Sequence, residues 1–226
     1  MKLFGVLTGD LVRSRDLSAE QQRHALGALS DMAGEFSRQH EGLAVGKLEV
    51  FRGDSWQFCL ERPELAVEAA VFLRAGLIAA GLDSRIAIGI GSVKSLDKRK
   101  ISRSSGPAFE ASGHGLDSLP KKRRLGLAFA DGVQNPSADS LMGAVIPLID
   151  AQMEKWTSRE AFAVYGTLRG LTQQEIAELP EARTIKGVQP TRQAIHDALA
   201  RIQWYAILHP VLETTRGLVL GRGARV

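Results

Sequence analysis

Hydrophobic and polar residues alternate along the first half of the chain in patterns that predict both strands and helices. An apolar run over residues 2–8 ends in Gly9 and Asp10, and it predicts a buried strand that carries an acid at its end. Ser18 is a candidate N-cap for a helix that continues to about His40. The apolar positions of this helix are three and four residues apart and form one face: Leu26, Leu29, Met32, Ala33 and Phe36.

A hairpin and a second helix are predicted next. Residues 47–51 and 56–60 largely alternate apolar and polar side chains, and residues 52–55 between them read Arg-Gly-Asp-Ser, which is typical of a tight turn. An apolar segment over 63–80 starts with a proline and is followed by a glycine, as helices often are. Residues 84–91 alternate again and predict a fourth strand.

The order strand, helix, strand, strand, helix, strand is the ferredoxin-like arrangement, in which two helices back four antiparallel strands. Residues 94–105 carry five Lys or Arg among serines and predict an exposed loop. A short helix over 106–119 and a strand over 125–130 follow. We therefore expect an α+β fold, with a ferredoxin-like domain over residues 1–135 and an all-helical domain over residues 136–226.

The second half of the chain is predicted to be helical throughout. Its expected helices share apolar faces with three-and-four spacing and cover residues 136–153, 158–168, 172–179 and 191–205. Pro210 cannot continue a helix, so we expect the last helix to close just before it. Residues 216–226 are then expected to form a frayed tail.

Composition narrows the class of protein. The chain has 226 residues, 44% of them hydrophobic and 24% charged, which is typical of a soluble globular protein with a real core. A single cysteine, Cys59, excludes an intramolecular disulfide and fits a reducing compartment. The N-terminal apolar run is too short for a signal peptide or a membrane span, so we expect a cytoplasmic protein without a membrane partner.

The charge of the chain is concentrated near its C-terminus. The formal net charge is +4, a mild excess that permits a polyanionic partner. From Arg183 onward, seven Lys or Arg stand against two acids. The last fifth of the chain therefore carries an excess of positive charge.

Asp10 and Asp54 are the candidate metal ligands. Both stand beside a glycine at the end of a predicted strand, where a carboxylate can project clear of bulky neighbours. Mg²⁺ and Mn²⁺ accept one or two carboxylates together with water and phosphate oxygens, and two such ions can clamp a nucleoside triphosphate. The alternative is ordinary turn chemistry, since a Gly-Asp pair is common in hairpin turns.

Three segments carry a resemblance to known families. Residues 8–15 (Thr-Gly-Asp-Leu-Val-Arg-Ser-Arg), 52–57 (Arg-Gly-Asp-Ser-Trp-Gln) and 88–91 (Ile-Gly-Ile-Gly) resemble the SatD family and, more distantly, class III nucleotide cyclases and GGDEF cyclases. The resemblance covers residues 1–131 and implies a nucleotide-cyclase-like domain with Asp10 and Asp54 as metal ligands. It also implies that phosphates lie against the backbone N–H groups of Leu11, Val12 and Arg13.

The chain departs from the cyclase pattern in its third predicted helix. Glu110 and His114 stand where cyclases carry a substrate-orienting Asn and a transition-state Arg. A carboxylate cannot donate a hydrogen bond as an amide does, and a histidine is only partly cationic near neutral pH. Glu110 and His114 are therefore weak catalytic candidates, and the site is expected to bind with or without turnover. The candidates for reading a purine base are Lys47, Glu49 and Arg52.

The helical half contains a segment similar to helix-turn-helix regulators and sigma-factor region 4. Residues 171–177 read Leu-Thr-Gln-Gln-Glu-Ile-Ala, with Thr172 and Glu175 spaced as a capping box, and an amphipathic segment follows over 187–199. Residues 180–186 lengthen the turn beyond the usual three or four residues. The residues expected to face DNA are Gln189, Thr191, Arg192, Gln193 and His196. The alternative is a helical hairpin used for dimerisation or for packing on the first domain.

These features predict a DNA-binding transcriptional regulator whose first domain binds a nucleotide or a divalent metal as a sensor. Mg²⁺ or Mn²⁺ with a nucleoside triphosphate is the expected ligand, DNA the expected partner, and a homodimer is left open. One alternative is a metal-dependent nucleotidyl cyclase or nucleotidyltransferase that acts on a nucleoside triphosphate. Another is a degenerate domain that binds nothing and only mediates dimerisation. The identity of the base and the DNA target sequence are not specified.

Overall fold

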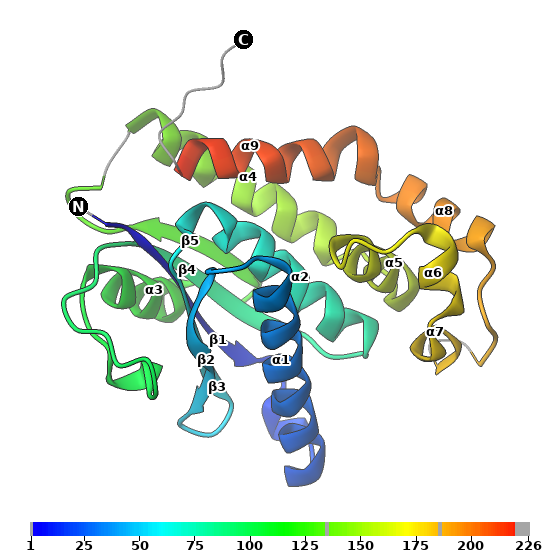
Figure 1. Cartoon of the computed structure of the whole chain (residues 1–226), viewed down its shortest axis with the longest axis horizontal. Helices are drawn as coiled ribbons and strands as arrows, with labels where there is room; N and C mark the ends of the chain where they lie inside the picture. Colours follow the sequence, from blue (N-terminus) through cyan, green and yellow to red (C-terminus); the bar gives the residue numbers. More distant parts are fainter. Residues whose placement is uncertain (1, 134–135, 185–186, 220–226) are drawn as a thin grey trace.

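The chain forms a five-stranded sheet with the order β2-β3-β1-β4-β5 (Figure 1). The computed structural model describes residues 2–133, 136–184 and 187–219. The strands are β1 (Phe4–Leu11), β2 (Ala44–Phe51), β3 (Ser55–Leu60), β4 (Ser84–Gly91) and β5 (Leu125–Phe129). The first four pair antiparallel, and β5 runs parallel to β4. This order and connectivity confirm the predicted ferredoxin-like arrangement.

Helices lie on both faces of the sheet. They are α1 (Ala19–Gln39) and α2 (Ala66–Ala79) on one face and α3 (Pro107–Ser118) on the other. The alternation of β4 explains this division: its isoleucines join the core under α1 and α2, while its small residues point to α3. A Cβ atom on Gly89 would lie 2.5 Å from the backbone nitrogen of Ser112, so α3 approaches the sheet as closely as glycine allows.

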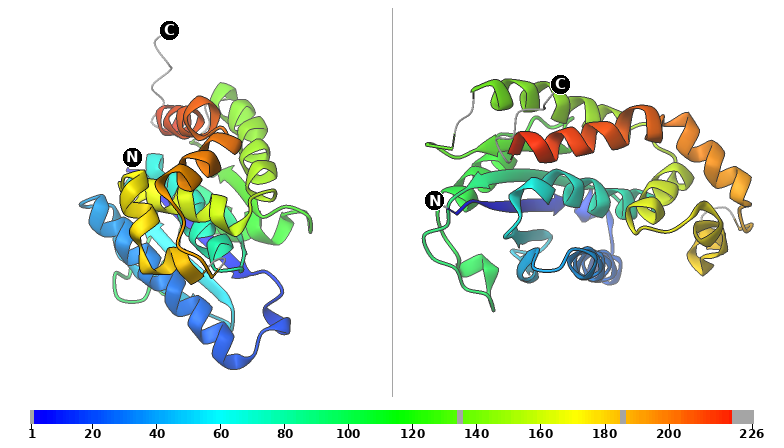
Figure 2. Two further views of the ribbon diagram at one scale, coloured as in Figure 1. Left: turned by 90° about the vertical axis from the view of Figure 1, so that its right-hand side faces the viewer. Right: turned by 45° about the horizontal axis from the view of Figure 1, so that its top comes forward.

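The C-terminal helices that begin at Ser158 and His209 pack on α2, and the other C-terminal helices pack on β5 or on one another. The C-terminal helices are α4 (Pro136–Met153), α5 (Ser158–Leu168), α6 (Gln173–Glu178), α7 (Pro180–Thr184), α8 (Arg192–Arg201) and α9 (His209–Val219), with a π-helical turn at Trp204–Leu208. Figure 2 shows α4 and α9 side by side across the top of the molecule. Because the sheet covers one side of α2 and these helices another, α2 is apolar on nearly all sides.

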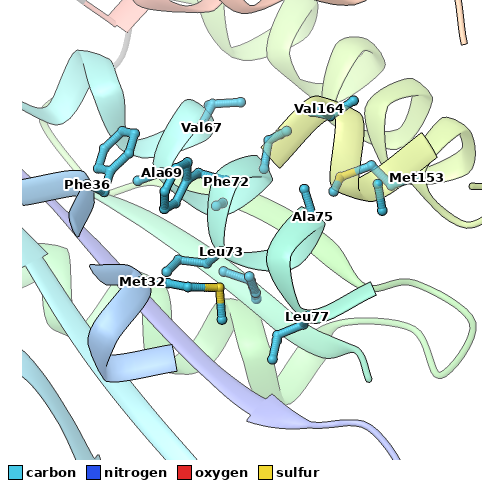
Figure 3. Close-up of a cluster of buried hydrophobic side chains, with 14 of the residues drawn as sticks. Met32, Phe36, Val67, Ala69, Phe72, Leu73, Ala75, Leu77, Met153 and Val164 are labelled. Carbon is cyan, nitrogen blue, oxygen red and sulfur yellow. The ribbon is translucent and has the colours of Figure 1, made fainter. Parts of the chain in front are cut away.

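One continuous hydrophobic cluster joins the sheet to the helices that follow it. Figure 3 shows side chains of α2 between those of α1, α4 and α5, among them Met32, Phe36, Phe72, Met153 and Val164. The rings of Phe36 and Phe72 lie 5.0 Å apart, and those of Phe72 and Tyr165 lie 4.8 Å apart. The division of the chain at residue 135 stays a prediction; α4 begins at the residue that follows it.

The end of the chain corrects two expectations. Pro210 does not end a helix but occupies the first turn of α9, where proline needs no backbone hydrogen bond. Residues 216–219 are the last turn of this helix instead of a frayed tail, because Arg216 pairs with Glu68 of α2 and Val219 is buried. Residues 220–226 of the expected tail lie outside the described part of the chain. The predicted helix over 191–205 is also shorter, since Gln203 breaks it with a φ of 54°.

Two smaller findings concern exposure. Cys59 is fully buried in β3, as its position in a predicted strand indicated, and burial raises the pKa of its thiol to about 12.

Among the helices described, none is long and apolar enough to cross a bilayer.

Candidate functional site

Four segments meet at one end of the sheet. Asp10 of β1 pairs with Ser55 of β3, so the hairpin turn that carries Asp54 lies beside it. On its other side Asp10 pairs with Arg85 of β4. Arg124 directly precedes β5 at the same end. The structure therefore brings the two predicted aspartates together and adds two arginines.

The hairpin turn has the geometry that its sequence requires. Arg52 and Gly53 both adopt the left-handed conformation, with φ values of 49° and 81°. Glycine adopts this conformation without strain, so the Arg-Gly-Asp sequence reverses the chain within three residues and leaves Asp54 next to β1. The side chain of Asp54 is partly exposed.

The two carboxylate oxygens of Asp10 have different surroundings. Its Oδ2 atom lies 3.4 Å from Arg85 Nη1, while Arg85 Nη2 donates to the carbonyl of Leu116 at 2.7 Å. Its Oδ1 atom is buried and accepts no hydrogen bond from any part of the chain described here. Burial raises the pKa of Asp10, and the charge of Asp54 raises it further, against the opposing effect of Arg85 and Arg124. One oxygen of Asp10 is therefore paired with Arg85, while the other has no partner.

The segment predicted to cradle phosphates follows Asp10 directly. Leu11 is the last residue of β1, and the N–H of Val12 donates to the carbonyl of Asp83 at 2.9 Å, so this amide is used within the protein. Arg13 is exposed and adopts the left-handed conformation, with a φ of 55°. Of the three predicted residues, Arg13 has the cationic side chain, and it is exposed in the segment that follows Asp10.

Glu110 and His114 face away from this end of the sheet. Both are exposed on the outer side of α3. The opposite side of the helix packs on β1 and β4 through Ala108, Ser112 and Leu116, and Ser112 Oγ lies 2.8 Å from Thr8 Oγ1. One chain therefore does not bring Glu110 or His114 to Asp10, and a catalytic role for either stays a prediction.

The three candidates for reading a base do not converge. Lys47 and Arg52 are exposed, and Glu49 accepts hydrogen bonds from the backbone N–H and the hydroxyl of Ser102, both at 2.9 Å. Glu49 thus joins β2 to the loop over residues 94–105.

The residues predicted to face DNA are all exposed on or before α8. Thr191 caps this helix through the N–H of Ala194, and Gln193 donates to Asp197 at 2.7 Å. Gln189 donates to the carbonyl of Leu179 at 3.1 Å, so its side chain stabilises the turn after α6. Arg192 and His196 complete the outward surface, while Ile195 and Leu199 pack against α5 and α6.

Comparisons with known proteins give a likeness to solved structures. No protein-family model and no curated protein matches the chain. The chain is similar to a guanylyl cyclase. This solved structure, the guanylyl cyclase Cya2, is 17% identical, with a TM-score of 0.39 over 56% of this chain and 74% of that chain. A structural likeness of this extent does not assign the fold, which rests instead on the strand order of the sheet. The resemblance to the SatD family stays a prediction.

The carboxylates at this end of the sheet are of the type that binds Mg²⁺ together with further ligands. Within the described ranges, no group of three or more His, Cys, Asp or Glu side chains assembles into a metal site. Asp10 and Asp54 nevertheless offer two carboxylates, one with an unpartnered oxygen, and Mg²⁺ takes its remaining ligands from water and phosphate. Sequence reasoning missed Arg85 and Arg124. The signal for Arg85 was a charged residue within an otherwise apolar strand.

Proposed function

We propose that the chain binds a nucleoside triphosphate together with Mg²⁺ or Mn²⁺ at Asp10 and Asp54. The observation that supports this most is the buried Oδ1 atom of Asp10, which lacks a partner beside a second carboxylate. Two neighbouring carboxylates repel each other, and a cation between them removes that repulsion. Bound there, the cation would neutralise charge on the phosphate oxygens.

Each residue around the aspartates has a role in this proposal. Asp10 and Asp54 hold the cation. Arg85 positions Asp10, because its other nitrogen is fixed to the end of α3. Arg124 lies close enough to Asp10 to lower its pKa, and Arg13 is exposed in the segment that follows Asp10; both would supply positive charge to the phosphates.

Binding is the step that a nucleotide sensor and a nucleotidyl cyclase or nucleotidyltransferase would share. Of these two functions, the site would serve a nucleotidyl cyclase or nucleotidyltransferase most directly. Such an enzyme forms a cyclic or linked product, whereas a sensor does not. The outward position of Glu110 and His114 means that turnover would need other groups than these two in the same chain.

Calorimetric titration of ATP and GTP, each with Mg²⁺ or Mn²⁺, tests the site. We expect wild-type protein to bind and Asp54→Asn to bind at least about tenfold more weakly, because one charged ligand is lost. Asp31→Asn, at an exposed position on α1, is the matched control and should bind like wild type. Equal affinity of Asp54→Asn and wild type would refute the proposal. The recovered mixtures are analysed for cyclic and linked products.

DNA binding is a second candidate function, and the comparisons do not support it. The observation in its favour is the surface of α8, where Thr191, Arg192, Gln193 and His196 are all exposed in the basic part of the chain. The connection between α6 and α8 includes α7 and is therefore longer than the short turn between the two helices of most helix-turn-helix proteins.

Arg192→Ala tests this second function. We expect weaker binding to a short DNA duplex of mixed sequence and a salt dependence whose slope falls by about 1, because one phosphate contact is lost. Fluorescence anisotropy at several salt concentrations measures both quantities. Arg38→Ala, another exposed arginine but on α1, is the control. If the two variants behave alike, α8 does not contact DNA. Repeating the titration with saturating nucleotide tests whether the two sites are coupled.

A further inference from the structure

The loop between β4 and α3 carries a concentration of positive charge. Residues 94–105, here called the cationic loop, include one acid, Asp97, and five basic residues. All five basic side chains are exposed: Lys94, Lys98, Arg99, Lys100 and Arg103. None of them forms an ion pair with a residue that the structure describes. Their charges can therefore act on a partner outside the chain.

The cationic loop has a defined conformation. Its base is closed by backbone hydrogen bonds between Ser95 and Ser105, at 2.9 and 3.1 Å. Its middle is anchored by Ile101, which is 1% exposed and packs in a cluster of buried residues on the sheet. Gly46 of β2 lies so close to the carbonyl of Lys98 that an added Cβ would overlap it. The loop therefore lies against the edge strand β2 instead of extending into solvent.

Two carboxylates near these cations shape the loop. Asp97 Oδ1 accepts hydrogen bonds from the backbone N–H groups of Arg99 and Lys100, at 2.9 and 3.0 Å. Glu49 of β2 accepts hydrogen bonds from the backbone N–H and the hydroxyl of Ser102. These bonds fix the backbone that carries three consecutive cations. Because this backbone is already held in place, binding a partner costs less conformational entropy than it would for a mobile loop.

The cationic loop lacks the side chains that stack on bases or enter a lipid bilayer. It contains no aromatic residue, so it offers no surface on which an unpaired base could stack. Its apolar residues Leu96 and Ile101 pack on the sheet, so no large apolar side chain of the loop is exposed for insertion into a bilayer. Its exposed groups are cations and serine hydroxyls, which are the groups that contact phosphate oxygens.

We propose that the cationic loop binds the phosphate backbone of a nucleic-acid duplex without selecting a base sequence. A duplex presents its phosphates on the outside at regular spacing, whereas its bases face inward. The three consecutive cations at residues 98–100 would contact several phosphates at once. Each contact releases counterions, so the affinity falls steeply as the salt concentration rises.

This surface is separate from the two sites described above it in the chain and beyond it. The cationic loop and α8 lie at opposite ends of the molecule (Figure 1). The loop follows the end of β4 that pairs with Phe4, whereas Asp10 pairs with Arg85 near the beginning of β4. The inference therefore depends neither on nucleotide binding at the aspartates nor on DNA binding by α8.

A triple substitution in the loop tests the proposal: Lys98→Gln, Arg99→Gln and Lys100→Gln. Fluorescence anisotropy at several salt concentrations measures binding to a DNA duplex and to an RNA duplex of the same mixed sequence. We expect wild type to bind, and the triple variant to bind at least about tenfold more weakly at low salt. The slope of log affinity against log salt concentration should fall by about 2–3, because up to three phosphate contacts are lost. A loss with either duplex supports the proposal and identifies the duplex that the loop fits.

A second triple variant is the matched control for net charge. It carries Lys121→Gln, Lys122→Gln and Arg123→Gln, in the turn between α3 and β5. It loses the same number of charges as the loop variant, but at the other end of α3. We expect it to keep the salt slope of wild type. If the two triple variants behave alike, or if wild type binds neither duplex, the proposal is overturned.

Two substitutions at Asp97 test whether the conformation of the loop matters. Asp97→Asn removes the charge but keeps an acceptor for the N–H groups of Arg99 and Lys100, so it should bind at least as tightly as wild type. Asp97→Ala has the same net charge but no acceptor, and we expect it to bind about threefold more weakly than Asp97→Asn. Equal affinities of the two variants would overturn the role given to the fixed backbone.

Anionic vesicles of phosphatidylserine and phosphatidylcholine separate a membrane surface from a nucleic acid as the partner. We expect wild type to bind the duplex more tightly than the vesicles, because the loop exposes no large apolar side chain. If the substitutions at residues 98–100 weaken binding to the vesicles but not to either duplex, the partner is a membrane and the proposal is wrong.

Discussion

Replacing Arg74 with methionine is expected to lower the free energy of unfolding by about 3–5 kcal/mol. The Arg74 side chain is completely buried and pairs with Asp83 at 2.7 Å and with Asp150 at 2.6 Å. Asp150 is only 5% exposed, so it would keep a buried charge with the backbone N–H of Arg124 as its remaining partner. The loss is a large share of the stability of an ordinary domain.

Urea denaturation followed by circular dichroism measures this change. Arg74→Met combined with Asp150→Leu should recover part of the loss, because removing both partners leaves no uncompensated charge at Asp150. Arg38→Ala, at an exposed arginine, should stay within about 0.5 kcal/mol of wild type. A loss below about 1 kcal/mol in Arg74→Met would show that this ion-pair network does not join α2 to α4 as the structure indicates.

Gly89→Ala is expected to destabilise the fold by about 1–3 kcal/mol. The added Cβ would press on the carbonyl oxygen of Ala108 and lie 2.5 Å from the nitrogen of Ser112. Both are backbone atoms of α3, so no side-chain rotation relieves the contact and the helix must move away from β4. Thermal unfolding by circular dichroism measures the effect.

Gly113→Ala is the matched control on the same helix. An added Cβ there meets nothing within 4 Å, and alanine is favoured over glycine inside a helix by up to about 1 kcal/mol. The two glycine-to-alanine changes should therefore shift the melting temperature in opposite directions. Equal shifts would mean that α3 is not packed closely on the sheet.

The sequence alone determined the order of the elements and part of the site. Period-two alternation identified the strands over 47–51, 56–60 and 84–91, and capping signals at Ser18 and Thr172 identified helix starts. The adjacency of Asp10 and Asp54 also followed from sequence, because a hairpin beside a central strand places its turn at a known end of the sheet. These features depend on interactions between residues that are near in the chain or fixed by strand pairing.

Only the tertiary structure decided what depends on packing between distant segments. The exposure of Glu110 and His114 follows from the face of α3 that fits the small residues of β4. The last turn of α9 is ordered by the contact of Arg216 with Glu68, far away in sequence. Arg85 reaches Asp10, and Arg124 lies close enough to lower the pKa of Asp10, because β4 and β5 begin at the end of the sheet where β1 ends. Local periodicity carries no record of such long-range contacts, which is why the sequence did not reveal them.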